Sequence, residues 1–303
     1  MNKRSRLGVL GKRESTEGIL LYLPAILIVF GIVFFPMAYA MVMSFTGYRV
    51  SKPVMNFIGL KNYTKILADP GFGDAVLRSI VFTFGSLIPQ IVLGLAMAML
   101  LNSPRLRCKT LFRGLAITPW LIPTVAVAIV FRWMFNDIYG IINHAAIGMG
   151  FIEDSFAWLS NSTGAMFVMI LANVWRGTPL LLTQFLAGLQ GIPGDVYEAA
   201  QVDGANAWER FSQITVPLLL PVLMVSGVLR FIWTFNFYDL PWVLTGGGPV
   251  DATTTTPIYA YKRAFSSYRM GEGSAITILL FLILLIFAVV YFYFRNRQDD
   301  IYR

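Results

Sequence analysis

Arginine, amide and aromatic side chains lie within two otherwise apolar stretches of the sequence, residues 164–190 and 215–240. The first stretch contains Asn173, Trp175 and Arg176. The second contains Trp233, Phe235, Asn236, Phe237, Tyr238 and Asp239. Such side chains suit polyhydroxylated rings, whose faces are apolar and whose edges carry hydroxyl groups. Any single aromatic residue here could equally pack against lipid or a neighbouring helix, so the cluster is more informative than its members.

Two arginines lie near the middle of these stretches, Arg176 in the first and Arg230 in the second. A charged side chain at membrane depth is costly and usually faces a cavity or a polar partner. Contact with a solute and pairing that stabilises the helix bundle are both consistent with these positions.

Enzymatic chemistry has little support in the sequence. A single histidine, His144, and a single cysteine, Cys108, argue against a Ser-His-Asp triad and a cysteine-based metal site. The sequence contains no Gly-x-x-x-x-Gly-Lys-Ser/Thr motif, which binds ATP phosphates in P-loop proteins. We therefore expect no catalytic residue, no metal site and no cofactor bound by this chain.

The elements that must position these residues are transmembrane helices. Hydrophobic residues make up 56% of the 303 residues and charged residues only 13%, against about 25% charged in soluble domains. Six stretches are long enough to cross a bilayer core of about 30 Å. They are residues 19–44, 76–101, 114–135, 164–190, 215–240 and 273–294. The sequence predicts an all-α membrane protein with one transmembrane domain, 19–294, between tails 1–18 and 295–303.

Basic residues set the expected orientation. With an inside N-terminus, the inner segments hold 13 Lys or Arg in 63 positions and the outer segments 7 in 91. The positive-inside rule then places both termini in the cytoplasm. The net charge of +8 follows from basic cytoplasmic loops, so nucleic acid is not expected as a partner.

The inner segment 191–214 has only one basic residue, so orientation does not account for it. Asp195 stands three residues before Glu198, and Asn206 stands three before Glu209. Both pairs are typical of capping boxes. Gly204 lies between them and can adopt the left-handed conformation that ends a helix. The segment predicts a helix, a sharp turn and a second helix.

This helical pair has apolar residues that need a partner, among them Val196, Val202, Trp208 and Phe211. The cytoplasmic ends of its own bundle could cover them, and so could a second protein. The spacing alone does not decide between the two.

The same segment resembles the EAA loop of ABC importer permeases. It reads Glu198-Ala199-Ala200, three residues, Gly204, nine residues, Ile214, one residue and Val216-Pro217. Val216 replaces the usual Leu. Further motifs are similar to the sugar branch of the family: Phe57-Ile58-Gly59-Leu60-Lys61-Asn62-Tyr63, Trp175-x-Gly177-x-Pro179, Asp203-Gly204-Ala205 and Leu244-Thr245-Gly246-Gly247-Gly248-Pro249. The resemblance covers residues 18–294.

The resemblance implies a permease subunit of an ATP-driven importer, which moves a sugar or sugar-like solute by alternating access. It implies that 191–214 couples to a separate ATP-hydrolysing subunit, with Glu198, Ala199, Ala200, Asp203 and Gly204 as coupling residues. It also implies a substrate pathway lined by Asn173, Arg176, Gly177, Leu180, Trp233, Phe235, Asn236, Tyr238 and Asp239.

The implied partners are a second permease subunit, two ATP-binding subunits that use ATP and Mg²⁺, an extracytoplasmic solute-binding protein and the lipid bilayer. The implied location is the cytoplasmic or inner membrane of a bacterium or archaeon.

Two other classes are open on the residues alone. A secondary transporter driven by protons or sodium needs carboxylates within its spans, and Asp239 is the one candidate. That class leaves the helical pair at 191–214 without a role. A membrane-embedded enzyme needs a catalytic constellation, which the residue inventory does not offer.

Overall fold

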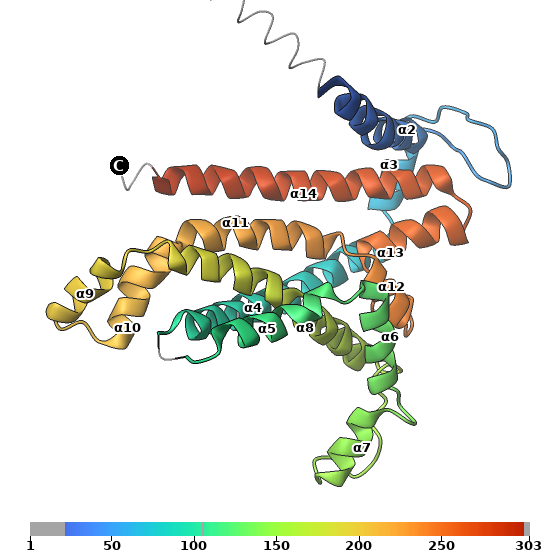
Figure 1. Ribbon diagram of the computed structural model, residues 1–303. Helices are drawn as coiled ribbons and strands as arrows, with labels where there is room; N and C mark the ends of the chain where they lie inside the picture. The colour runs from blue at the N-terminus through green and yellow to red at the C-terminus, as the bar shows by residue number, and fades with distance from the viewer. Residues whose placement is uncertain (1–21, 105, 300–303) are drawn as a thin grey trace, which may run out of the picture. The chain divides into compact units, whose positions relative to one another are not determined.

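The computed structural model describes residues 22–104 and 106–299 (Figure 1). The predicted tail 1–18, residues 19–21, Arg105 and residues 300–303 lie outside the described residues. The described chain divides into two units. One contains the chain up to Ala68 together with Lys262–Leu279, and the other contains Asp69–Tyr261 and the chain from Leu280.

Five described helices are long and apolar enough to cross a membrane: Tyr22–Ser44, Pro70–Asn102, Ser162–Gln190, Ala207–Phe235 and Met270–Tyr293. A bent pair, Lys109–Leu121 with Thr124–Met134, gives a sixth span when counted as one. The prediction of an all-α membrane protein with about six spans is confirmed.

In the first unit, a side-chain amide on one helix forms hydrogen bonds with the backbone at the end of another. The helix Tyr22–Ser44 includes the π-helical turn Phe30–Phe34 and ends as α2 (Phe35–Ser44). Asn62 of α3 (Lys61–Leu67) is buried and donates hydrogen bonds to the carbonyls of Ser44 (2.8 Å) and Thr46 (2.9 Å). The π-helical turn η3 (Lys262–Ser266) and the start of α14 (Met270–Asp299) complete the unit.

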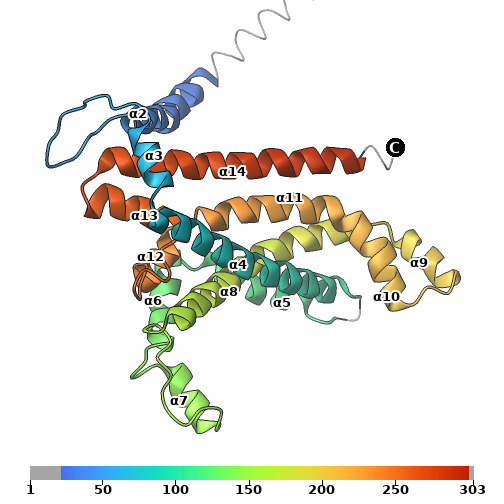
Figure 2. The ribbon, with the colours of Figure 1, turned by 180° about the vertical axis from the view of Figure 1, so that it is seen from behind.

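The second unit is a bundle around α4 (Pro70–Asn102), α8 (Ser162–Gln190) and α11 (Val216–Phe235). Helices α4 and α8 lie side by side in both views (Figures 1 and 2). Capping side chains explain where α4 and α8 start. Asp69 accepts from the Gly71 amide at 2.9 Å, and Asn161 accepts from the Thr163 and Gly164 amides at 3.0 Å.

Shorter helices complete the second unit. They are α5 (Lys109–Leu121), α6 (Thr124–Met134), α7 (Ile141–Gly148), α9 (Gly194–Val202), α10 (Ala207–Arg210), η2 (Phe211–Thr215), α12 (Asp239–Thr245) and α13 (Thr256–Tyr261). One apolar cluster contains Phe82, Phe131, Met169 and Leu240. A second cluster contains Leu181, Phe185 and Leu219.

The predicted span 114–135 is broken rather than straight. Helices α5 and α6 meet at an angle of 91°. The cause is Pro123, which lacks an amide hydrogen and disfavours helical geometry in the residue before it. Ile122 is accordingly extended, with φ −73° and ψ 133°. The predicted span 215–240 also differs, because α11 ends at Phe235 and a separate α12 begins at Asp239.

Candidate functional site

A closed ring of hydrogen bonds joins the three central helices of the second unit. Arg230 of α11 donates from Nε to the Oε1 atom of Gln90 on α4 (2.7 Å) and from Nη2 to the Oδ1 atom of Asn173 on α8 (3.0 Å). Gln90 in turn donates from Nε2 to the backbone carbonyl of Asn173 (2.8 Å). Arg230 is 7% exposed, and Gln90 and Asn173 are fully buried. The partners are neutral amide oxygens, so the positive charge of Arg230 is held in place without being cancelled.

The ring depends on the absence of a side chain at Gly177. A Cβ atom built there would overlap Nη2 of Arg230 and lie 2.6 Å from Nε2 of Gln90. Only glycine leaves this notch, so Gly177 in the Trp175-x-Gly177-x-Pro179 motif makes room for the guanidinium group of another helix.

A cavity of about 310 Å³ opens beside the ring. It is lined by Trp120, Arg176, Leu180, Arg230, Ile232, Trp233, Thr234, Asn236 and Phe237. None of these lining residues is acidic. Two guanidinium groups, one amide and two indole rings therefore share the cavity, a set that offers hydrogen-bond donors and flat apolar faces.

Arg176 differs from Arg230 in how it is held. Its Nε atom is buried and has no hydrogen-bond partner among the described residues. Its guanidinium carbon lies 6.0 Å from the centre of the Phe237 ring. The Nδ2 atom of Asn173 is also buried and unpaired within the described chain. Of these two residues only Arg176 lines the cavity, so its guanidinium group has an unused donor beside the cavity, whereas Arg230 uses two of its donors within the ring.

The structure divides the nine predicted pathway residues into three groups. Arg176, Leu180, Trp233 and Asn236 line the cavity. Asn173 and Gly177 lie behind it, where they hold Arg230. The other three lie away from the lining: Phe235, Tyr238 and Asp239.

These last three have other surroundings. Phe235 is buried in an apolar cluster with Leu87, Phe231 and Leu280. Tyr238 stacks on Trp242 with ring centroids 5.7 Å apart. Asp239 is exposed and begins α12.

Sequence reasoning missed Trp120 and Gln90 as members of the site, and it named Phe237 in the stretch 215–240 without placing it on the pathway. Gln90 carried a usable signal, because an amide beside Pro89 in the middle of an apolar stretch needs a polar partner. Trp120 lies on α5, which packs against α8, and this packing of distant segments has no local sequence signal. Trp175 lines a separate, almost wholly apolar pocket of about 360 Å³ with Phe131 of α6.

The segment 191–214 forms the predicted helix–turn–helix. Helix α9 ends in a Schellman motif, in which the Ala205 amide donates to the Ala200 carbonyl (2.8 Å) and the Gly204 amide to the Gln201 carbonyl (3.1 Å). Gly204 has φ +84°. The turn prediction is confirmed, and open space surrounds Gly204, so its backbone angle alone requires glycine there.

Of the two predicted capping boxes, one forms. Asn206 accepts from the Trp208 and Glu209 amides (2.9 and 3.0 Å), and the Glu209 carboxylate accepts from the Asn206 amide (2.7 Å). The Asp195–Glu198 box was wrong. Pro193 takes the N-cap position, so Asp195 lies inside the first turn of α9 and caps nothing.

The predicted coupling residues lie on the surface of this pair. Glu198, Ala199, Asp203 and Gly204 are exposed, and Ala200 is half-buried. No hydrogen bond or ion pair engages the Glu198 side chain within the described residues. Val202 and Trp208 are 88% and 71% exposed. This surface has both charge and apolar area, and no other part of the described chain covers it.

The pair is nevertheless attached firmly to a span. The Tyr197 hydroxyl lies 3.0 Å from Oγ1 of Thr215, next to the start of α11. The helix Ala207–Phe235 runs without a gap from the capping box to the cavity residues Ile232 and Trp233. A force on α10 is therefore applied to the same helix that presents Arg230.

Comparisons with known proteins agree with this geometry. Residues 90–299 match a family described as the inner membrane component of binding-protein-dependent transport systems. The trehalose/maltose transport system permease protein MalF of Thermococcus litoralis is 37% identical over 291 residues, which cover 95% of this chain and 96% of the relative. The sulfoquinovosyl glycerol transport system permease protein SmoG of Agrobacterium fabrum is 31% identical and covers 93% of this chain and 91% of its own.

Among solved structures, a chain of a bacterial ABC transporter that imports the acidic polysaccharide alginate has a TM-score of 0.82 at 21% identity. The match covers 96% of this chain and 99% of that chain. The alginate transporter has also been solved in complex with its alginate pentasaccharide-bound periplasmic protein, again with a TM-score of 0.82 at 21% identity, over 95% of this chain and 96% of that chain. At this identity the likeness establishes the fold.

Proposed function

The chain belongs to the family of inner membrane components of binding-protein-dependent transport systems, and from this premise we propose that it forms one half of the pore of a sugar importer. The family resemblance read from the motifs is confirmed, and curated relatives include permeases named for trehalose/maltose and for sulfoquinovosyl glycerol. The solute is a sugar or sugar-like molecule, moved by alternating access rather than transformed.

The observation that carries the proposal is the α9–α10 pair. It is capped at Asn206, turned at Gly204, exposed at Glu198 and Trp208, and continuous with a helix that reaches the cavity. A segment with this construction is suited to receive a push from another protein and transmit it to the solute site. The protein that contacts this surface at Glu198 is an ATP-binding subunit. Two such subunits, which use ATP and Mg²⁺, power the complex.

The proposal also includes the other subunits of the transporter and the orientation of this chain in the membrane. A second permease subunit completes the pore, and an extracytoplasmic solute-binding protein delivers the solute on the outer side. Both termini and residues 191–214 face the cytoplasm, in agreement with the distribution of basic residues, and the membrane is the cytoplasmic or inner membrane of a bacterium or archaeon. The cavity beside Arg230 is the solute-binding site. Arg176 and Asn236 offer hydrogen bonds there, and Trp120 and Trp233 offer apolar faces.

The test uses the whole transporter, with its partner subunits, in proteoliposomes. A Gly204→Val substitution places a β-branched residue in the left-handed region, which costs about 1–2 kcal/mol and deforms the turn. Gly204→Asn is the matched control, because asparagine tolerates that region. We expect solute uptake to fall at least tenfold in Gly204→Val and to be largely retained in Gly204→Asn, with equal membrane insertion of both.

A charge change on the same surface provides a second arm. Glu198→Lys should abolish solute-stimulated ATP hydrolysis, whereas Gln201→Lys, an exposed change on the same helix, should not. Wild-type uptake should require ATP and persist when ion gradients are collapsed. Uptake that follows a proton or sodium gradient and ignores ATP would instead establish a secondary transporter.

A further inference from the structure

The outer loops carry basic residues that topology does not require. In the proposed orientation, segments 45–75 and 241–272 hold Arg49, Lys52, Lys61, Lys65, Lys262, Arg263 and Arg269. The third outer segment, 136–163, holds none. Outer loops are normally poor in Lys and Arg, so a concentration of seven in two of three loops needs another cause.

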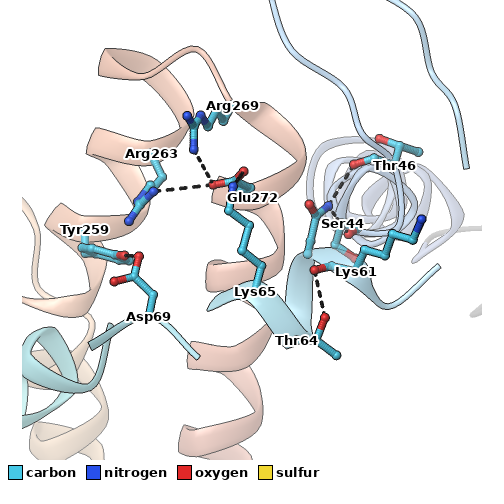
Figure 3. A network of polar contacts seen from close by, with 11 residues as sticks. Ser44, Thr46, Lys61, Thr64, Lys65, Asp69, Tyr259, Arg263, Arg269 and Glu272 are labelled. Carbon is cyan, nitrogen blue, oxygen red and sulfur yellow. Dashed lines mark hydrogen bonds and ion pairs between the residues drawn. The ribbon is translucent and has the colours of Figure 1, made fainter. Parts of the chain in front are cut away.

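The first unit brings these two distant segments together around one carboxylate. Glu272 lies in the first turn of α14, and its side chain is 8% exposed. Its Oε1 atom lies 2.5 Å from Nζ of Lys65, and its Oε2 atom lies 3.5 Å from Arg269 and 3.7 Å from Arg263 (Figure 3). Both carboxylate oxygens are thus already engaged by three cations.

Two further cations remain without a carboxylate. Arg49 and Lys61 are exposed, and among the described residues no acidic group lies within ion-pair distance of either. Both line a concave pocket of about 160 Å³, together with Lys65, Arg269 and Glu272. The pocket lining therefore contains four cations and one carboxylate, a net charge of +3. Its volume equals that of roughly five water molecules, enough for a carboxylate group with part of its hydration.

The loop that forms one wall of this pocket is ordered. The Val50 amide donates to the Tyr268 carbonyl (3.0 Å), and the Gly271 amide donates to the Tyr48 carbonyl (3.2 Å). The loop continues beyond the C-terminal end of α2 (Figures 1 and 2). It also exposes apolar side chains near the charges, with Phe57 at 78% and Val54 at 65%. Aromatic and apolar anchors beside charged groups are typical of protein interfaces.

We infer that this basic pocket is a docking point for an acidic side chain on the solute-binding protein, with Arg49 and Lys61 as its recognising groups. The inference rests on the proposed function, because it names the permease surface that receives the delivery protein. The charges are solvent-exposed, so they accelerate encounter and orient the partner more than they add to affinity. Glu272 prevents Lys65 and Arg269 from folding outwards, so the pocket keeps its shape before the partner arrives.

The experiment measures association of the purified solute-binding protein with the complete transporter in nanodiscs. The variant Arg49→Glu with Lys61→Glu reverses the two unpaired charges. We expect association about tenfold slower at low ionic strength, with the difference shrinking above about 0.5 M salt as screening shortens to a few ångströms. Lys52→Glu is the control, because it is a charge reversal on the same loop outside the pocket lining. It should slow association less than about threefold.

Neutral substitutions guard against a general effect of reversed charge. Arg49→Gln with Lys61→Gln should give a smaller change in the same direction. Unchanged association in both double variants would overturn the inference. A defect that depends on the anionic lipid content of the nanodiscs, with normal binding of the solute-binding protein, would also overturn it by assigning the pocket to lipid headgroups.

The same preparation separates this inference from the proposed function. Wild-type chain that fails to assemble with ATP-binding subunits would overturn both. An assembled transporter whose ATP hydrolysis is stimulated equally in all variants by a limiting concentration of the solute-binding protein, at low ionic strength, would overturn the docking point alone.

Discussion

Among the residues whose burial is described, each unit has one buried charged side chain, and the two are bonded in opposite ways. Arg230 in the second unit is bonded to neutral amide oxygens of Gln90 and Asn173. Glu272 in the first unit is surrounded by Lys65, Arg263 and Arg269. Amide partners fix the direction of a cation but leave its charge available, whereas three cations compensate a single carboxylate more than fully. The first arrangement suits a group that faces a changing occupant, and the second suits a fixed anchor.

Both centres also depend on a glycine. A Cβ atom on Gly177 would overlap the Arg230 guanidinium. A Cβ atom on Gly271 would overlap the Thr46 carbonyl oxygen and lie 3.1 Å from Nδ2 of Asn62. The two glycines differ in what they make room for. Gly177 leaves space for the side chain of Arg230, whereas Gly271 lets two backbone segments approach closely.

The largest effect is expected from Gly177→Ala. The added methyl group cannot be accommodated without moving Arg230 or Gln90, and such overpacking costs about 1–3 kcal/mol. We expect uptake to fall at least tenfold and the melting temperature of the purified transporter to drop. Gly227→Ala is the matched control, since it adds the same methyl group to α11 three residues before Arg230 with no atom within 4 Å.

A double variant sharpens this result. If the clash with Arg230 is the cause, Gly177→Ala combined with Arg230→Met should be no worse than Arg230→Met alone. Fully additive losses would instead show that Gly177 acts independently of the guanidinium group.

Arg230→Met should have an effect of comparable size. It leaves Oε1 of Gln90 and Oδ1 of Asn173 buried without their donor, at about 1–3 kcal/mol for each unsatisfied group. We expect both a lower melting temperature and a loss of solute-stimulated ATP hydrolysis, with basal hydrolysis retained. Arg230→Lys supplies one charged donor in place of two directed ones and should recover stability better than stimulation. Equal recovery of both would remove the distinction between anchoring and solute response.

Glu272→Gln should have the smallest effect of the three on transport. The substitution leaves Lys65, Arg263 and Arg269 to repel one another, but these cations are 50%, 26% and 35% exposed, so solvent screening limits the cost to about 1 kcal/mol. We expect a lower melting temperature, measured at low salt and partly restored at high salt, with uptake per folded transporter unchanged. A strong transport defect without destabilisation would reverse the proposed contrast between the two centres.

Local features of the chain were predictable from sequence, and features that depend on distant partners were not. The turn at Gly204 and the Asn206–Glu209 capping box involve neighbours along the chain, so their residue types were sufficient. The Asp195 box failed for an equally local reason, because Pro193 starts the helix earlier than the acidic residue suggests.

The cavity beside Arg230 shows the limit of sequence-based reasoning. Arg176, Trp233 and Asn236, which line this cavity, stand out in the sequence because polar and aromatic residues are unusual in apolar stretches. The partnership of Arg230 with Gln90 spans 140 positions, and no local pattern reports it. Phe235 lies in an apolar cluster although its neighbours on α11 line the cavity, because the helix turns its side chain to another face.

The break between α5 and α6 bears on how the protein is made. At 1.5 Å per residue, α5 and α6 rise about 20 Å and 17 Å, and neither alone crosses a hydrocarbon core of about 30 Å. Backbone groups at Ile122–Pro123 have lost helical partners and cannot face lipid. Trp120 and Ile122, next to the break, line different cavities. During synthesis this segment therefore has no stable place in the bilayer until α8, against which α5 packs, has emerged from the ribosome and entered the membrane.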